Sequence, residues 1–467
     1  MFFLFLRYNW AMAELKRNIS KHFLRWKSKN ERRPLIVWGA RQVGKSTSIA
    51  QFGNAQFRSL HTFNFQKEPS LKAIFHEDLN PSHLVQSLSL IRRREITEQD
   101  LIFFDEIQEC PEALTSLKYF AENLPSQPLI AAGSHLGLVK NEAAFPVGKV
   151  EFLSLHPLTF FEFLENFEPE TADFLKAQEL LLPDPVSEFY HQRALHWLRI
   201  YLCTGGMPEV LNSFKSNSEG DDERKSAMAA REIQLRLVES YQSDFSKHAG
   251  TVNANHILRV FDNVALQLGR AQDETVKKLK FSNVIPKKKG FEAIEGPLTW
   301  LEKSRLIIKA SIANRFEQPI RAFTAQNYFK AYLFDVGILN AMLNVPVESL
   351  LLEQLGQFKG YLAENFVAQE LYSVFDKPLI SWSERESEVE FIISRGSQLC
   401  PIEVKASKRS RQAKSLDALI ARYHPETSFK LTGQNRGYLK ERKIYTLPLY
   451  WVSKICEPNS TNLSSVE

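Results

Sequence analysis

The stretch from Leu35 to Ala50, LIVWGARQVGKSTSIA, constrains the fold of this chain more than any other. Leu35–Trp38 is an unbroken apolar run, typical of a central strand that is buried on both faces. Gly39–Ser46 then reads G-x-x-x-x-G-K-S, and the residues from Thr47 onward can begin a helix. Strand, glycine loop and helix in this order predict a phosphate-binding loop.

The residue types in this loop suit the chemistry of a nucleotide phosphate. Gly39 and Gly44 supply backbone freedom and close approach, so that successive N–H groups can surround phosphate oxygens. Lys45 adds a positive charge at the terminal phosphates, and the Ser46 hydroxyl can ligate Mg²⁺. The predicted cofactors are therefore ATP and Mg²⁺. The predicted nucleotide contacts are Gly39, Ala40, Arg41, Gln42, Val43, Gly44, Lys45, Ser46 and Thr47.

Two further predicted strands end in polar residues that would reach the same site. Leu101–Glu106, LIFFDE, places two carboxylates at the carboxyl end of an apolar strand, where ligands bind in open α/β sheets. Asp105 would hold Mg²⁺, directly or through water, and Glu106 would polarise the attacking water. The strand Pro128–Ala132 is followed by Gly133 and Ser134, and the Ser134 hydroxyl could bond that water or the γ-phosphate. A turn serine is the alternative.

Composition bounds the class of protein. With 467 residues the chain is too long for one core, and about two to four domains are expected. Its four cysteines are scattered without a C-x-x-C pair, which argues against structural zinc and favours a reducing compartment. The N-terminal run FFLFL is too short for a signal-peptide core or a membrane span, and no other stretch approaches that length. We therefore expect a cytoplasmic protein with no membrane partner.

These motifs together resemble the AAA-type P-loop ATPases. More narrowly, the chain resembles a prokaryotic family in which an AAA domain precedes a C-terminal domain of the DUF4143 type. The resemblance implies an α/β fold with a helical lid, ATP hydrolysis and a ring-forming homo-oligomer. The segments that carry it are Gly39–Thr47 (GARQVGKST), Phe103–Gln108 (FFDEIQ), Gly133–Leu138 (GSHLGL), His156–Leu164 (HPLTFFEFL), Gly205–Leu211 (GGMPEVL), Lys330–Leu339 (KAYLFDVGIL), Leu362–Leu371 (LAENFVAQEL) and Pro401–Ser407 (PIEVKAS).

One position departs from the family pattern. The segment before the HPLTF motif usually contains a Gly-Arg pair, and here it is Gly148 followed by Lys149. If this residue acts across a subunit boundary, lysine keeps the charge but loses the bidentate fork of arginine. No arginine occurs between Arg94 and Arg193, so Lys149 is the candidate finger and slow hydrolysis is an open alternative.

A second region resembles a DNA-binding module. Gly296–Ser304 (GPLTWLEKS) and Arg305–Ile312 (RLIIKASI) look like the last helix and the wing of a winged helix-turn-helix. This predicts contact with duplex DNA through lysines on the phosphates. Winged helices also serve as protein-interaction modules, and that alternative stays open. The candidate phosphate contacts are Lys277, Lys278, Lys280, Lys287, Lys288 and Lys289.

The C-terminal region carries a second candidate chemistry, because its acids resemble the PD-(D/E)xK nuclease pattern. Period-two alternation puts Glu403 and Lys405 on one face of a strand. Glu390 and Glu403 could hold Mg²⁺, Glu364 from a preceding helix could complete the metal shell, and Lys405 could activate a water. Glu390 stands where the nuclease pattern has Asp, so a nuclease-like fold kept for binding or assembly is the alternative.

We predict five regions and weigh three functions. The regions are an N-terminal helical segment (1–32), an AAA-type core (33–165), a helical lid (166–235), a winged-helix region (236–345) and a nuclease-like DUF4143 domain (346–467). The leading hypothesis is an ATPase that acts on DNA through its last two regions. The alternatives are an ATP-gated, metal-dependent nuclease and a slow, nucleotide-switched assembly protein.

Overall fold

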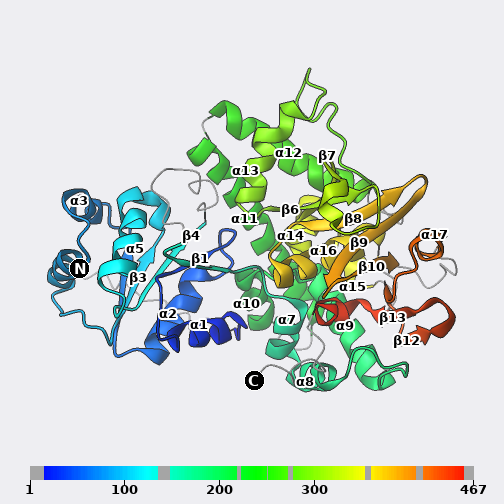
Figure 1. Cartoon of the computed structure of the whole chain (residues 1–467), viewed down its shortest axis with the longest axis horizontal. Coiled ribbons are helices and arrows are strands. Elements are labelled where there is room, and N and C mark those ends of the chain that lie inside the picture. Colours follow the sequence, from blue (N-terminus) through cyan, green and yellow to red (C-terminus); the bar gives the residue numbers. More distant parts are fainter. Residues whose placement is uncertain are drawn as a thin grey trace.

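The computed structural model describes residues 15–134, 148–217, 222–249, 251–271, 277–352, 359–405 and 414–456. Within them an N-terminal α/β unit is followed by a group of helices and then by a second sheet (Figure 1). The apolar run at the N-terminus and the part of the GSHLGL segment beyond Ser134 lie outside the described residues.

The first sheet contains the strand that was predicted before the phosphate loop. It also contains the strand predicted to end in Asp105 and Glu106 and the strand predicted to precede Ser134. Its five parallel strands run in the order β2-β3-β4-β1-β5, so β4 lies between β1 and β3. Alternate residues of β1 face two different cores: Leu35 and Val37 face one, and Ile36 faces the other. This two-sided burial explains the unbroken apolar runs. The strands are β1 (Leu35–Trp38), β2 (Leu60–Asn64), β3 (Leu101–Asp105), β4 (Leu129–Gly133) and β5 (Glu151–Ser154).

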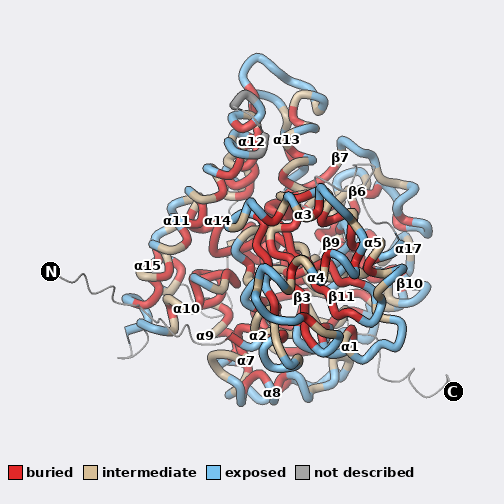
Figure 2. Tube along the Cα trace, turned by 90° about the vertical axis from the view of Figure 1, so that its left-hand side faces the viewer, coloured by how far each residue is buried: buried red, intermediate tan, exposed pale blue. Residues whose placement is uncertain are grey.

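Helices cover both faces of this sheet. The first core receives α1 (Ile19–Lys27) and α2 (Lys45–Gln56), and the second receives α3 (Leu71–Glu77), α4 (Pro81–Arg92) and α5 (Pro111–Asn123). The helices that follow the sheet are α7 (Phe160–Phe167), α8 (Pro169–Ala177), α9 (Glu188–Thr204), α10 (Pro208–Ser216), α11 (Glu223–Ala249), α12 (Thr251–Arg270) and α13 (Glu292–Lys303). Figure 2 shows the described residues between α12 and α13, 277–291, projecting from the body of the molecule.

The second sheet has eight strands in the order β12-β13-β11-β10-β9-β8-β6-β7. Its strands are β6 (Ile307–Ala313), β7 (Thr324–Leu333), β8 (Leu379–Glu384), β9 (Ser387–Arg395), β10 (Gln398–Lys405), β11 (Ser428–Thr432), β12 (Gly437–Leu439) and β13 (Ile444–Pro448). The helices in this part of the chain are α14 (Val336–Met342), α15 (Val347–Leu351), α16 (Gly360–Phe375), α17 (Lys414–Tyr423) and α18 (Val452–Ile455).

The strand expected to be a wing belongs to this second sheet. β6 pairs antiparallel with β7 on one side and parallel with β8 on the other. The predicted boundary between 236–345 and 346–467 therefore separates β6 and β7 from the sheet in which they lie. The physical reason is that a buried hairpin strand has the same apolar alternation whichever sheet it joins.

Four of the family-like segments meet at one joint, which connects the N-terminal α/β unit to the rest of the chain. The Leu158 amide donates to the Gly206 carbonyl at 2.7 Å, and the Gly206 amide donates to Asp335 Oδ2 at 2.7 Å. The Phe160 amide donates to Glu370 Oε1 at 2.9 Å. These contacts join the segments HPLTF, GGMPE, FDVG and VAQEL, which lie far apart in the sequence.

Candidate functional site

The phosphate-binding loop lies between β1 and the N-terminus of α2. A Cβ on Gly39 would lie 2.0 Å from the Leu155 carbonyl oxygen, so only glycine lets the loop pack against the end of β5. Gly44 has a φ of 93°, a left-handed conformation that glycine adopts without strain. Both glycines of the sequence pattern therefore have a steric reason, and the loop leads directly into the helix as predicted.

Lys45 is buried and folded back onto its own loop. Its Nζ donates to the carbonyl oxygens of Gly39 at 2.9 Å and Ala40 at 2.8 Å. Burial lowers the pKa of Lys45 to about 8, against the opposing attraction of Glu106 and Asp105. The ammonium group is therefore held at the phosphate loop by two of the loop's own carbonyls, with Asp105 and Glu106 nearby.

The predicted magnesium residues contact one another directly. The Ser46 hydroxyl donates to the two carboxylate oxygens of Asp105 at 3.0 and 3.1 Å. Asn64 Nδ2 donates to Asp105 Oδ2 at 2.9 Å. Burial and the neighbouring Glu106 raise the pKa of Asp105. A hydroxyl beside a buried carboxylate is a donor set that suits Mg²⁺.

Asn64 is a residue of this site that sequence reasoning missed. It ends β2, and the parallel register places it opposite Asp105 of β3. The available signal was its position as the polar end of an alternating strand, HTFN, in a parallel sheet. That signal becomes specific only when the pairing of β2 with β3 is known.

Glu106 has a backbone conformation that is unusual for a residue with a side chain. Its φ is 52°, and its side chain accepts a hydrogen bond of 2.6 Å from Gln108 Nε2. Positive φ at a non-glycine residue costs energy and is concentrated at functional sites. The turn holds the Glu106 carboxylate at the end of β3, one residue beyond Asp105.

Ser134 and Arg41 lie at the same edge of the sheet, against α11. Gly133 pairs with Trp38 of β1, so Ser134 follows β4 at the level of the loop. Arg41 forms an ion pair with the buried Asp244, and the Tyr241 hydroxyl donates to the Arg41 carbonyl at 3.2 Å. Asp244 was not predicted, because nothing in its local sequence indicates a contact with the phosphate loop.

Lys149 lies away from this site. Glu151, the first residue of β5, pairs with Leu35, the first residue of β1, so Lys149 sits at the opposite edge of the sheet from the loop. Its Nζ forms an ion pair of 3.0 Å with Glu122 at the end of α5. Within one chain Lys149 therefore cannot contact the same phosphate site.

Two lysines, Lys330 and Lys405, form ion pairs with the acids of the C-terminal region. Lys405 Nζ lies 3.1 Å from Glu403 and 3.9 Å from Glu390, and Glu390 also accepts a hydrogen bond from the Val404 amide at 3.0 Å. Burial raises the pKa of Glu403 to about 6. Glu403 and Lys405 therefore form an ion pair within β10, and Glu390 also holds the backbone of that strand.

The second lysine, Lys330, was not predicted. It is fully buried, with its Nζ 2.5 Å from Glu388 and 3.6 Å from Glu364. No group of three or more carboxylate, histidine or cysteine side chains in the described ranges is arranged to hold a metal ion. The second magnesium site of Glu364, Glu390 and Glu403 stays a prediction. In this structure these acids lie beside the two lysines.

The candidate DNA contacts lie on a surface loop. Lys287, Lys288 and Lys289 are exposed in the segment between α12 and α13. Lys278 lies over the Tyr328 ring at 5.0 Å. In the part of the chain that the structure describes, no helix is long and apolar enough to cross a membrane.

Comparisons with known proteins divide the chain into three matched regions. Residues 31–164 match the family model of an AAA domain. Residues 195–349 match a domain of unknown function, DUF8612, and residues 359–452 match another, DUF4143. No curated protein matches the sequence.

Solved structures show weaker similarity. The Walker-type ATPase of Pyrococcus abyssi is 16% identical with a TM-score of 0.45, covering 71% of this chain and 96% of that one. The Aeropyrum pernix ORC1 protein in complex with DNA is 14% identical with a TM-score of 0.30, covering 72% and 92%. The Thermotoga maritima RuvB Holliday junction branch migration motor is 12% identical with a TM-score of 0.30, covering 63% and 89%.

Proposed function

We propose that this chain, which matches the models of an AAA domain and of a C-terminal DUF4143 domain, binds ATP with Mg²⁺ and hydrolyses the terminal phosphate. The observation that carries the proposal is the contact of Ser46 with Asp105 beside the buried Lys45. A phosphate loop alone binds anions. A phosphate loop with a hydroxyl and a carboxylate at the same edge also suits a metal-bound nucleotide.

Different residues of the site would bind the metal ion and the phosphates. Bound Mg²⁺ would neutralise the negative charge that develops on the phosphates. Ser46 and Asp105 would hold the ion, with Asn64 orienting the Asp105 carboxylate. Lys45 would leave the carbonyls of Gly39 and Ala40 and turn to the phosphates.

Water activation falls to the residue after the metal-binding aspartate. Glu106 would accept the proton of the attacking water while Gln108 holds its carboxylate in place. Ser134, at the end of the adjacent β4, would hydrogen-bond the water or the γ-phosphate.

We also propose a homo-oligomer in which Lys149 faces the nucleotide of a neighbouring copy. Its place at the opposite edge of the sheet excludes a role in its own site and suits one in trans. A lysine there offers a point charge without the bidentate geometry of arginine, so basal hydrolysis would be slow.

DNA is the partner that we propose first, because of the projecting, exposed lysines at 287–289. The alternative is a protein-directed switch. Turnover of ATP by the purified protein, measured with and without duplex and single-stranded DNA, separates them. We expect DNA to stimulate turnover, and turnover indifferent to DNA would favour the protein-directed switch.

For the C-terminal domain we favour a structural role over the nuclease alternative. The buried Lys330 supplies positive charge among the acids at the place where a nuclease would need a metal. We therefore expect no Mg²⁺- or Mn²⁺-dependent nicking of supercoiled plasmid. Nicking by the native protein that disappears in Lys405→Ala would establish the nuclease instead.

A further inference from the structure

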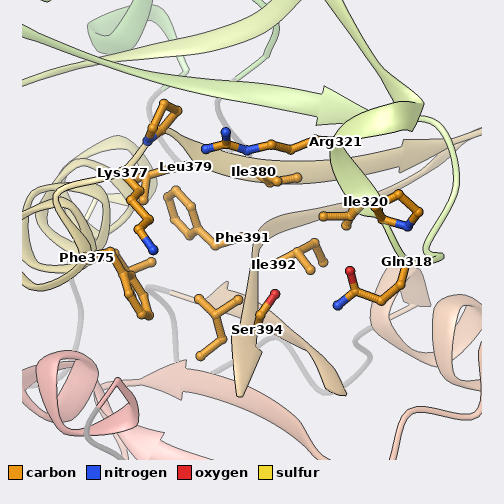
Figure 3. A pocket seen from close by; sticks show the side chains of 14 residues that line it. Gln318, Ile320, Arg321, Phe375, Lys377, Leu379, Ile380, Phe391, Ile392 and Ser394 are labelled. Carbon is orange, nitrogen blue, oxygen red and sulfur yellow. The ribbon is translucent and has the colours of Figure 1, made fainter. Parts of the chain in front are cut away.

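A pocket of about 370 Å³ lies on the second sheet, away from the phosphate loop and from the acids around Lys405. It is bounded by the segment before β7, by the end of α16 and by β8 and β9 (Figure 3). Its volume falls near the lower end of the roughly 300–1,000 Å³ of small-molecule sites. A pocket of this size suits a small molecule and not a polymer.

The interior of this pocket is apolar. Leu379, Phe391 and Ile393 are buried and line it, together with Leu371 and Phe375 of α16. Gln318 and Ser394 are the lining residues with uncharged polar side chains. A ligand that fills this space therefore needs an apolar body with few hydrogen-bonding groups.

The rim of the pocket is positively charged. Arg321 and Lys377 line it, both are exposed, and neither forms an ion pair with any described residue. None of the lining residues is acidic. Figure 3 shows the Arg321 guanidinium over Ile380, and the Lys377 amino group on the other side of the Phe391 ring. Two cations at the rim of an apolar pocket favour a ligand that carries negative charge.

An irregularity in the sheet shapes this site. Ile380 of β8 pairs with Ile392 of β9, whereas Trp382 pairs with Val389, so β9 carries an extra residue at this point. A bulge of this kind bends a strand and redirects its side chains, and bulges are frequent beside binding sites. The bulge therefore lies next to Ile380 and Ile392, which line the pocket.

We propose that this pocket binds a small apolar monocarboxylate, with the positive rim of Arg321 and Lys377 attracting the carboxylate and the apolar interior holding its hydrocarbon body. The proposal is independent of the ATPase proposal, because it shares no residue with the phosphate loop.

Calorimetric titration of the full-length protein with octanoate tests this proposal, with octanol as the uncharged comparison. We expect saturable octanoate binding, weakened about tenfold or more in the double variant Arg321→Gln/Lys377→Gln, with octanol affinity unchanged. Lys440→Gln, an exposed lysine near the far edge of the sheet, is the matched control and should bind octanoate like the native protein.

A second variant tests the place of binding. Ser394→Trp puts a large side chain at an exposed position that lines the pocket, so it should abolish binding of both probes without removing a cation. Absence of saturable octanoate binding would overturn the proposal. Equal octanoate affinity in the native protein and in both variants would overturn it as well.

Discussion

The Lys45 ammonium group has its hydrogen-bond partners within the phosphate loop when no nucleotide is bound. This group is buried and satisfied by two loop carbonyls, and burial has lowered its pKa to about 8. A phosphate dianion or trianion placed beside it favours the charged form. Binding of a nucleotide and protonation of this one residue are therefore coupled.

We predict that ATP binding takes up protons at pH 8.5 to 9. The free protein has lost part of the Lys45 charge above a pKa of about 8, and the bound phosphates restore it by raising that pKa. Calorimetry in two buffers with different ionisation enthalpies measures the uptake. At pH 6.5 Lys45 is already charged, so the same titration should show no uptake at this group. Equal proton uptake at both pH values would contradict the assignment.

At the scale of elements, the joint depends on the close approach of the Gly206 and Leu158 backbones. A Cβ on Gly206 would lie 2.2 Å from the carbonyl oxygen of Leu158. The Gly206 carbonyl also accepts a hydrogen bond from the Leu158 amide, and the Gly206 amide donates one to Asp335. A backbone carbonyl cannot move aside as a flexible side chain can. Adding a methyl group at Gly206 should therefore disturb the joint.

We expect Gly206→Ala to lower the free energy of unfolding by about 3 kcal/mol, through overpacking at the joint. The matched control is Gly437→Ala in β12, where an added Cβ meets no heavy atom within 4 Å outside its two chain neighbours. Replacing that glycine should leave stability unchanged or raise it by up to about 1 kcal/mol. Denaturant unfolding of both variants measures the difference. Similar stability of the two variants would mean that the joint tolerates the methyl group.

Glu370 predicts a pH dependence for the same joint. Burial raises its pKa to about 8, from an ordinary value of 4.5. The protonated form is favoured in the fold, so its contribution is fully present below about pH 4.5 and is lost as the pH rises through about 8. The side chain accepts a hydrogen bond from the Phe160 amide, which glutamine can also accept.

We therefore expect Glu370→Gln to be more stable than the native protein at pH 8, by more than about 1.4 kcal/mol, the equivalent of one pKa unit. At pH 4.5 the two proteins should have similar stability. Unfolding at both pH values, with the exposed Glu441→Gln as control, measures this. An equal difference at both pH values would show that Glu370 does not titrate in this range.

Sequence patterns predicted the elements that depend on local order. The phosphate loop follows from glycine spacing, and β1 and β3 follow from apolar runs that two-sided burial requires. Asn64, Asp244 and Lys330 were missed because their roles depend on which strand or helix lies beside them. The same limit explains β6, whose alternation does not reveal that its second neighbour is β8.

At the scale of the whole molecule, the segments that carry the family resemblance fall into two groups. Gly39–Thr47 and Phe103–Gln108 lie at the phosphate loop, whereas Leu158, Gly206, Asp335 and Glu370 join the two units. The Arg41–Asp244 pair connects the phosphate loop itself to α11. A nucleotide that moves the loop would therefore act on the helices that lead toward the projecting lysines.

We predict that the triple variant Lys287→Gln/Lys288→Gln/Lys289→Gln weakens duplex DNA binding and lowers the salt slope of log K by about 2 to 3, close to one unit for each phosphate contact. Fluorescence anisotropy over a range of salt concentrations measures both quantities. Lys440→Gln, an exposed lysine on the C-terminal sheet, should change neither. An unchanged slope in the triple variant would show that this loop does not contact DNA.

ATP turnover of the native protein and of Glu106→Gln, with ATP affinity measured for each, tests the central claim most directly. Glutamine keeps the size of the side chain but cannot accept a proton from water, so we expect similar affinity and at least about a hundredfold slower hydrolysis. Glu109→Gln, on the same turn, is the matched control and should hydrolyse ATP at the native rate. Native turnover in Glu106→Gln, or no ATP binding by the native protein, would contradict the account.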